Sequence, residues 1–125
     1  MLTTDSFRLD GRVALVTGSG RNIGRAVAEA FAAAGAKVVV NGHRDQAALD
    51  DVVAGIKSRG GDAIGILADV GDDDAVSRMV QQTVATFGGI DVVVSNVGIR
   101  KMRAFLETTP QDWDDVLRSN LRASF

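Results

Sequence analysis

The residues best suited to bind a ligand lie in a glycine-rich segment near the N-terminus. A short apolar run, residues 13–16, comes directly before this segment, and an amphipathic helical pattern begins at its end. Backbone N–H groups of a glycine loop and the positive end of a following helix bind pyrophosphate, provided that no side chain keeps the ligand away. Glycine also adopts the backbone angles of a tight turn. We therefore predict a dinucleotide phosphate site formed by Thr17, Gly18, Ser19, Gly20, Arg21, Asn22, Ile23 and Gly24.

The same segment has two other interpretations. A Walker-type phosphate loop is excluded, because no glycine in the sequence is followed by lysine. A glycine-rich turn that binds no ligand is the second interpretation, and a lone glycine pattern would not distinguish it from a binding loop. The placement of this loop between a strand and a helix, in the first such unit of the chain, favours binding.

The residues after the second predicted strand indicate which dinucleotide binds. NAD-binding chains place an acidic residue about 20 positions beyond the glycine loop, where it bonds the ribose 2′-hydroxyl. Here the strand ends at residue 40, and the first acid that follows is Asp45. Arg21 and Arg44 instead provide two guanidinium groups, which bind phosphate through paired, charge-assisted hydrogen bonds. We predict NADP(H) as the cofactor. In the alternative, NAD binds, Asp45 bonds the ribose and both arginines are solvated.

Composition excludes several other classes of site. The 125 residues carry a net charge of −2, which does not favour binding to nucleic acid. The sequence has no cysteine, which removes disulfides and thiolate chemistry, and its single histidine, His43, argues against a histidine-built metal site. Residues 1–12 lack the apolar stretch of a signal peptide, and no apolar run is long enough to span a bilayer. We expect a cytoplasmic protein that binds neither nucleic acid, membrane nor metal.

The elements that would position the glycine loop alternate between strand and helix. Short apolar runs, of the kind buried on both faces of a parallel sheet, occur at residues 13–16, 37–40, 63–68 and 92–94. Helical patterns lie between them, and Gly35 fits the position just beyond the first. We expect the apolar helix faces to form core. In the first helix that face comprises Ile23, Ala26, Val27, Ala30, Phe31 and Ala34.

A loop is expected over residues 96–108, and a final helix begins after it. Thr109 is typical of an N-cap, Pro110 suits the first helical position, and Asp112 approximates the acid of a capping box. The apolar stripe of this helix includes an amide, which must be hydrogen-bonded if it is buried. The stripe comprises Trp113, Val116, Leu117, Asn120, Leu121 and Ser124. Because the pattern still runs at Phe125, we expect the helix to continue in a longer polypeptide.

Strands that alternate with helices at this spacing predict an α/β fold with right-handed crossovers. We predict a Rossmann-type, doubly wound parallel sheet whose first four strands have the order 3-2-1-4, with helices on both faces. Residues 1–125 would form a single partial domain. Residues 92–94 are three valines and make a poor sheet edge, because they are apolar and carry neither lysine nor proline. We therefore expect further strands to pair there.

Several motifs, in chain order, resemble the short-chain dehydrogenase/reductase family. Residues 9–18, LDGRVALVTG, and residues 23–26, IGRA, resemble the start of that family, whose glycine loop reads TGxxxGxG. The loop matches at both ends, whereas Asn22 stands where the middle glycine is usual and Gly20 adds an extra glycine. The resemblance covers residues 9–125, and several ordered motifs are more specific than any one alone.

The resemblance implies further cofactor-binding residues. The pair after the third strand resembles the family's adenine-binding residues, and the sequence SNVG after the fourth strand resembles its NNAG motif. The implied contacts are Asp69, Val70, Asn96, Val97 and Gly98. In the alternative readings, Asp69 caps a strand end and Asn96 is an ordinary turn residue. Asn120 resembles the family's structural and catalytic asparagine, and its alternative is a hydrogen-bonded core amide.

The resemblance also implies an activity, which is hydride transfer between a nicotinamide cofactor and a carbonyl or alcohol. The family's chemistry uses a serine and a Tyr-x-x-x-Lys motif, in which the tyrosine is the general acid/base and the lysine lowers its pKa. This sequence contains no tyrosine, and Asn120 is the one member of that catalytic group present. The resemblance therefore implies an NAD(P)(H)-dependent oxidoreductase in a longer parent polypeptide. It also implies a small-molecule substrate, a homo-oligomer, and no activity for residues 1–125 alone.

Two other functions fit part of the sequence. A non-catalytic nucleotide-binding or self-associating module would cover the valine strand with a second copy and would therefore form dimers. An S-adenosylmethionine-dependent methyltransferase would share the fold, but it requires an acid at the end of the second strand and leaves Asn96 and Asn120 unexplained. The basic residues Arg100, Lys101 and Arg103 could meet an acidic substrate, although charged loops are usually only solvated.

Overall fold

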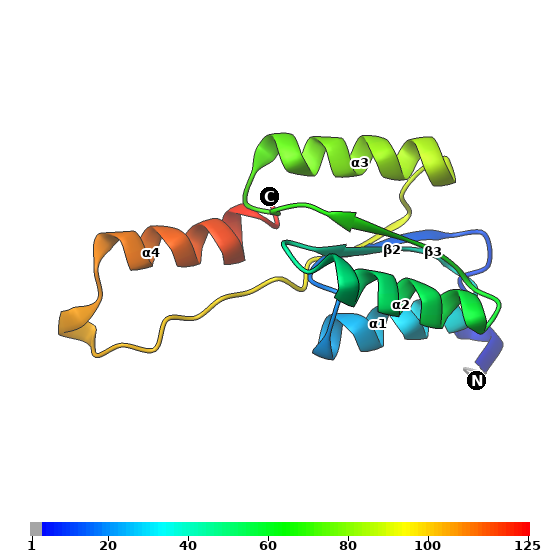
Figure 1. Cartoon of the computed structure of the whole chain (residues 1–125), viewed down its shortest axis with the longest axis horizontal. Coiled ribbons are helices and arrows are strands. Elements are labelled where there is room, and N and C mark those ends of the chain that lie inside the picture. Colours follow the sequence, from blue (N-terminus) through cyan, green and yellow to red (C-terminus); the bar gives the residue numbers. More distant parts are fainter. Residues whose placement is uncertain (1–3) are drawn as a thin grey trace.

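The computed structural model describes residues 4–125, and its elements follow the predicted alternation of strand and helix (Figure 1). The strands are β1 (Val13–Val16), β2 (Lys37–Gly42), β3 (Asp62–Leu67) and β4 (Val92–Val94). The helices are α1 (Asn22–Ala33), α2 (Gln46–Ser58), α3 (Asp73–Phe87) and α4 (Pro110–Leu117), with single 3-10 turns at Thr4–Phe7 and Phe105–Glu107 and a π-helical segment at Arg118–Arg122. None of the helices in this described range is long and apolar enough to cross a membrane.

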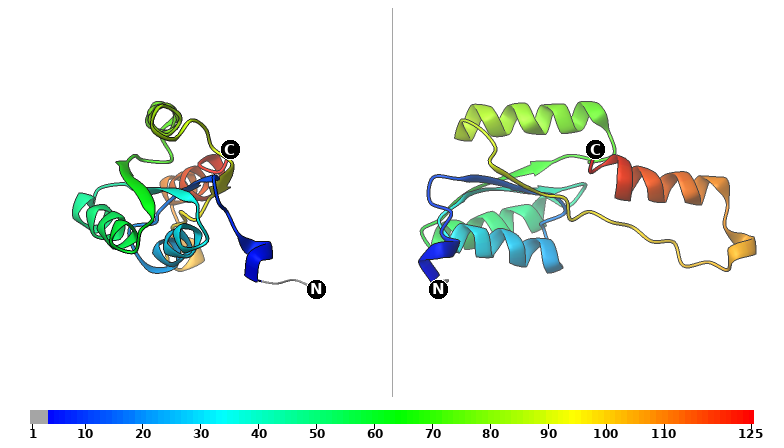
Figure 2. Two further views of the ribbon diagram at one scale, coloured as in Figure 1. Left: turned by 90° about the vertical axis from the view of Figure 1, so that its right-hand side faces the viewer. Right: turned by 180° about the vertical axis from the view of Figure 1, so that it is seen from behind.

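The four strands form one parallel sheet in the predicted order, β3-β2-β1-β4. Leu15 of the inner strand β1 lies opposite Val39 of β2 and Val93 of β4. β2 runs two residues beyond its predicted end because Asn41 and Gly42 still pair with β3, and β3 begins and ends one residue earlier than predicted. α1 and α2 cover one face of the sheet and α3 covers the other (Figures 1 and 2). The sheet is therefore doubly wound.

The strands are apolar throughout because helices cover both faces of the sheet. All four residues of β1 are buried, and their side chains alternate between the two faces. The layer under α1 and α2 consists of Ala14, Val16, Ala28, Ala36, Val38, Val40, Leu49, Val52, Ile56 and Ala63. The layer under α3 is smaller and consists of Leu15, Val39, Ile66, Ala68 and Met79. This smaller layer leaves Val80 and Val84 of α3 exposed.

The face that α1 turns toward the sheet differs from the predicted one. Val27 and Phe31 pack against the core as expected, but Gly24 and Ala28 are the fully buried positions. The exposed members of the predicted stripe are Ile23, Ala26 and Ala30. The absent or small side chains of Gly24 and Ala28 let the helix approach the sheet closely, so residue size decides which face packs. Gly35 follows the helix at a left-handed φ of 102°, as predicted.

The segment after β4 extends away from the sheet before α4 returns toward it (Figures 1 and 2). Thr109 and Asp112 form the predicted capping box at the start of α4. The expectation that the stripe on this helix is buried is wrong for this chain, since Trp113 is 63% exposed and Leu121 is 66% exposed. No helix or strand among residues 4–125 covers that stripe. Val93 of β4 is also 61% exposed, so β4 is an edge of the described sheet.

Candidate dinucleotide-binding site

A cleft lies at the carboxyl ends of the parallel strands, where the loops that follow all four of them meet. The strand order reverses between β1 and β4, and doubly wound sheets bind ligands beside such a point. The cleft is lined by residues 18, 20–24, 41–45, 48–49, 68–70, 96–99 and 118–119. The lining brings together most of the predicted cofactor residues. Thr17, Ser19 and Asn120 lie outside it, whereas Arg118 and Ser119 join it without having been predicted.

The glycine loop turns tightly between β1 and α1. Gly18 has a φ of 60°, and a Cβ there would lie 2.9 Å from Cγ2 of Val97. A Cβ at Gly24 would overlap the carbonyl oxygen of Gly18 and would lie 2.6 Å from Nδ2 of Asn96. Both glycines are therefore required by close approach of neighbouring groups, and Gly18 also by its backbone conformation.

The N-terminus of α1 differs from those of the other described α-helices. Asp45, Asp72 and Thr109 cap α2, α3 and α4 by accepting a hydrogen bond from a backbone N–H. Arg21, the N-cap of α1, provides no such acceptor, and the first turn of α1 contains no acid. The first turn of a helix leaves backbone N–H groups without intrahelical partners. In α1 these groups lie at the cleft, where an anion can accept from them.

Asn22 has a backbone conformation usual for glycine. Its φ is 50°, and it is the one non-glycine residue with positive φ among residues 4–125. Asparagine tolerates this left-handed region better than most side chains. The turn therefore keeps the shape that a middle glycine would give it, although the sequence departs from the family pattern at this position.

Substitutions at Asn22 should separate backbone strain from ligand contact. We expect Asn22→Gly to keep its affinity for a dinucleotide within about twofold, because glycine adopts the same φ freely. Asn22→Val should lower the free energy of unfolding by about 1–2 kcal/mol, because a β-branched residue is strained at positive φ. Urea unfolding and nucleotide titration of both variants measure these effects. Equal stability of the two variants would show that the positive φ at position 22 does not strain the backbone of a β-branched residue.

Ser19 and Asn41 brace the glycine loop from beneath. Ser19 is fully buried, and its Oγ donates to the carbonyl of Val16 at 2.6 Å and accepts from the Asn41 N–H at 3.0 Å. Nδ2 of Asn41 donates to the carbonyls of Ile66 and Ala68, both at 3.2 Å. Ser19 was predicted as a cofactor contact, and its side chain here joins β1 to β2. Asn41 was not predicted as a site residue, although a polar residue that ends an apolar strand was a visible signal.

Asn96 fastens the end of β4 to the glycine loop. Its Nδ2 donates to the carbonyls of Thr17 and Gly18, both at 3.1 Å. The Asn96 N–H in turn donates to Oγ1 of Thr17 at 3.0 Å. Asn96 lines the cleft and Thr17 does not. The two predicted site residues therefore meet, with Thr17 acting in the structure as a support for the loop.

Two arginines at the cleft are available to a ligand, Arg21 in the glycine loop and Arg44 after β2. Oδ1 of Asp45 accepts from the Ala48 N–H at 3.0 Å, so this carboxylate already serves as the cap of α2. Arg21 and Arg44 line the cleft and are exposed. Neither forms an ion pair with an acid in the described part of the chain.

Asp69 is held by two donors at the end of β3. Its Oδ1 accepts from the Gly71 N–H at 2.9 Å, and its Oδ2 accepts from Nη1 of Arg118 at 3.0 Å. The hydrogen bond from Gly71 and then that from Arg118 hold the pKa of Asp69 below its usual value. Asp69 therefore remains an anionic acceptor at the wall of the cleft.

Asn120 lies outside the cleft, in the π-helical segment Arg118–Arg122. Its Oδ1 accepts from the Ile99 N–H at 2.7 Å, and its Nδ2 donates to the Ile99 carbonyl at 2.9 Å. The amide is exposed, although the stripe pattern indicated a buried one. Single π-turns of this kind are frequent at functional sites. In this chain the amide joins the loop after β4 to the last helical segment.

Two of the basic loop residues, Lys101 and Arg103, form ion pairs with α4. Nζ of Lys101 lies 2.6 Å from Oδ2 of Asp115 and 3.0 Å from Oδ1 of Asp112, and Arg103 lies 3.6 Å from Asp112. The hydrogen bond from the backbone of Thr109, followed by that from Lys101, holds the pKa of Asp112 far below its usual value. Two of the three cations considered for an acidic substrate are therefore used to hold the loop against α4.

The amino-acid sequence matches a known family model and several curated relatives. The family model described as short chain dehydrogenase matches residues 12–125. The chain is 50% identical over 125 residues to a versicolorin reductase of Emericella nidulans, a match that covers 100% of this chain and 47% of the relative. It is 48% identical over 122 residues to versicolorin reductase 1 of Aspergillus parasiticus, which covers 98% of this chain and 47% of the relative. The chain thus spans about half the length of the curated relatives it matches.

Solved structures give the same result. A dehydrogenase/reductase from Sinorhizobium meliloti has a TM-score of 0.95 and 37% identity, covering 98% of this chain and 48% of the other. A short chain dehydrogenase from Burkholderia cenocepacia, solved in complex with NADP, has a TM-score of 0.89 and 41% identity, covering 93% of this chain and 47% of the other. The fold of this chain therefore recurs in proteins of similar sequence.

Proposed function

The chain belongs to the short chain dehydrogenase family, and from this we propose that it forms the NADP(H)-binding part of an oxidoreductase acting on a carbonyl or alcohol. The observation that carries the proposal is the start of α1. It is uncapped, it contains no acid, and it lies in a cleft beside two arginines that have no acidic partner among the described residues. The family match favours this function over the non-catalytic module and the methyltransferase.

The residues of the cleft fit a phosphorylated dinucleotide. The backbone N–H groups at the start of α1 would bind the pyrophosphate, and the close contacts around Gly18 and Gly24 keep side chains out of that position. Arg21 and Arg44 would bind the 2′-phosphate, and Asp69 would accept a hydrogen bond from adenine. Asn96 would hold the loop in place. When bound, the cofactor supplies or accepts a hydride.

Proton transfer in this proposal comes from outside residues 1–125. The family resemblance implies a serine and a Tyr-x-x-x-Lys motif, and the chain contains no tyrosine. We propose that these groups belong to the part of the polypeptide that the curated relatives have beyond the matched half. Asn120 would act as a positioning residue, because it joins the last helical segment to the loop at the cleft. The homo-oligomer implied by the family resemblance is part of the same proposal.

Nucleotide titration tests the proposal directly. We expect NADPH to bind at least about tenfold more tightly than NADH, because an arginine–phosphate contact contributes roughly 1.5–3 kcal/mol. Fluorescence of the bound nucleotide measures both affinities, and S-adenosylmethionine should not compete. Comparable affinities for NADPH and NADH would contradict the NADP preference. Failure of a cooperatively folded protein to bind either nucleotide would contradict the function.

A further inference from the structure

Arg118 connects the last helical segment to the wall of the cleft. Its Nη1 donates to Oδ2 of Asp69 at 3.0 Å, across 49 positions of sequence. Asp69 follows β3, whereas Arg118 begins the segment after α4. Both residues line the cleft, and both side chains are partly exposed. The ion pair is therefore part of the surface that a ligand would meet.

The Asp69 carboxylate is held through both of its oxygens. Oδ1 accepts from Gly71 and Oδ2 accepts from Arg118. Nε2 of His43 lies 3.8 Å from the same Oδ2. A carboxylate bound on both sides has a fixed plane, so its remaining lone pairs point in fixed directions. The arrangement can present a directed acceptor to the cleft.

Gly71 lets Arg118 reach Asp69. A Cβ at Gly71 would lie 2.7 Å from Nη1 of Arg118 and 3.1 Å from its Cγ, so the arginine side chain lies directly on the glycine backbone. Gly71 is not among the glycines with positive φ. Alanine is therefore compatible with the backbone here, and its methyl group would displace a flexible side chain rather than strain the fold.

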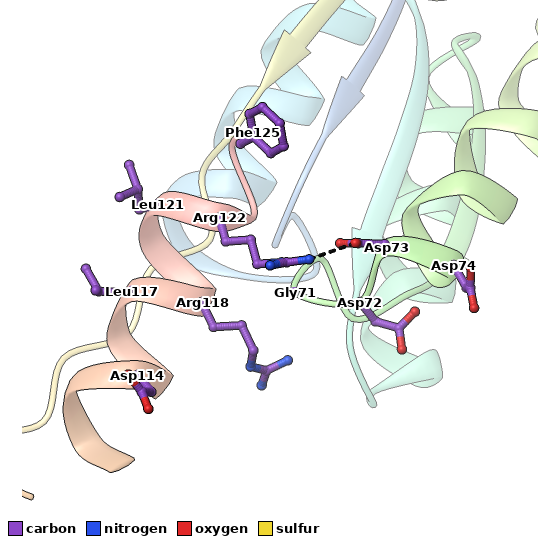
Figure 3. Close-up of a pocket in the computed structure, with 10 residues that line it drawn as sticks. All are labelled: Gly71, Asp72, Asp73, Asp74, Asp114, Leu117, Arg118, Leu121, Arg122 and Phe125. Atoms are coloured by element: carbon purple, nitrogen blue, oxygen red, sulfur yellow. Dashed lines mark hydrogen bonds and ion pairs between the residues drawn. The ribbon is translucent and has the colours of Figure 1, made fainter. Parts of the chain in front are cut away.

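A second ion pair joins the same two segments outside the cleft. Arg122 donates to Asp73 at 2.8 Å. Arg118 and Arg122 both extend from the last helical segment toward the loop between β3 and α3, and the dashed line marks the pair of Arg122 (Figure 3). Arg122 does not line the cleft. Its ion pair therefore provides a matched control for the docking of the helix.

We propose that Arg118 is a positioning residue for the dinucleotide, which orients the Asp69 carboxylate toward the adenine amino group. This inference rests on the proposed function, which assigns Asp69 to adenine. Hypoxanthine carries an oxygen where adenine carries that amino group. A fixed carboxylate acceptor should bind the amino group and repel the oxygen, so the base provides a probe of Asp69.

Binding of NADPH and of reduced nicotinamide hypoxanthine dinucleotide phosphate should respond differently to loss of the ion pair. We expect Arg118→Gln to weaken NADPH binding about tenfold and to weaken binding of the hypoxanthine analogue by about twofold or less. Gly71→Ala should reproduce this loss, because it displaces the guanidinium without removing its charge. Arg122→Gln should leave both affinities unchanged. In an Asp69→Ala background, Arg118→Gln should have no further effect on the preference for adenine.

The pH profile of NADPH binding gives a second readout. This profile would not change if Arg118 had only a structural role. Gly71 and Arg118 lower the pKa of Asp69, so removing Arg118 should raise that pKa toward its ordinary value. Affinity that depends on the carboxylate is present above this pKa and is lost below it. The loss should therefore begin at higher pH in Arg118→Gln. The titratable neighbours of the pair are His43, Asp72 and Asp115, so the profiles are also compared in a His43→Gln background.

Three outcomes decide the inference. Wild-type affinities and an unchanged pH profile in both Arg118→Gln and Gly71→Ala would overturn it, while leaving NADPH binding intact. Equal weakening of both nucleotides by the Arg118 and Arg122 variants would also overturn it, because the ion pairs would then only dock the helix. Failure of the wild-type protein to bind NADPH would instead count against the proposed function. Thermal unfolding of each variant, measured alongside, identifies any variant that does not fold.

Discussion

Replacing Gly24 with alanine should weaken NADPH binding about 100-fold, through the loss of one to two charge-assisted phosphate contacts. The new methyl group would overlap the carbonyl oxygen of Gly18 and crowd Nδ2 of Asn96. Neither obstacle moves freely, because Nδ2 of Asn96 donates to the carbonyls of Thr17 and Gly18. The N-terminus of α1 would therefore move away from the cleft. The overlap should also lower the free energy of unfolding by about 1–3 kcal/mol. Isothermal titration and urea unfolding measure the two effects.

Gly55→Ala is the matched control for this variant, because Gly55 also lies within a helix, α2. A Cβ there would meet only the guanidinium of Arg59, at 3.8 Å, which is an ordinary contact. Alanine in a helix interior should then raise the free energy of unfolding by about 0.5–1 kcal/mol and leave NADPH binding unchanged. If the two variants behaved alike in both measurements, the close contacts of Gly24 with Gly18 and Asn96 would not explain weaker binding or lower stability in Gly24→Ala.

Removing Arg21 and Arg44 together should abolish the preference for NADPH over NADH. Each guanidinium–phosphate contact contributes roughly 1.5–3 kcal/mol, so the double alanine variant should bind NADPH about 100-fold more weakly or worse. NADH binding should change by about threefold or less, because exposed charges without a ligand contact contribute little. Parallel titrations with the two nucleotides separate loss of phosphate recognition from general damage to the cleft.

The matched control removes two other exposed cations, Arg78 on α3 and Lys57 near the end of α2. Neither lines the cleft, so the change in net charge is the same without loss of a proposed contact. Unchanged affinity for both nucleotides is expected in 150 mM salt, where charges farther apart than about 8 Å are screened. An equal fall in NADPH affinity in both double variants would indicate that the net charge of the protein attracts the nucleotide. It would reject Arg21 and Arg44 as the phosphate site.

Much of the fold could be predicted because its signals are local. Buried runs such as residues 13–16 are apolar without interruption when both faces of a parallel sheet are covered. The capping box of Thr109 and Asp112 spans three positions and needs no tertiary partner to form. The glycine loop is equally local, since it occupies one turn between a strand and a helix. The alternation of strand and helix predicted a doubly wound sheet, for which the usual strand order is 3-2-1-4. The glycine loop supplies residues 18 and 20–24 of the cleft lining.

Hydrophobicity alone does not determine which face of a helix is buried in this chain. The periodicity of α1 predicts that Ile23 and Ala26 face the sheet. Gly24 and Ala28 are the buried residues instead, because a close approach of helix and sheet needs small residues. The stripe of α4 was expected in the core, yet Trp113 is largely exposed in the described chain. A periodic pattern shows that a face is apolar, and it does not show what covers that face.

By itself, the sequence determined the alternation of elements, the glycine loop and the family, because each is recorded in spacing over a few residues or in motifs in chain order. Only the tertiary structure decided which polar groups support the cleft. Ser19 meets Asn41 across 22 positions, and Arg118 meets Asp69 across 49. Such contacts depend on how strands and helices are placed relative to one another. No local pattern records them. The side chain of Ser19, in the middle of the glycine loop, is an example, because its hydrogen bonds to Val16 and Asn41 are visible only in the folded chain.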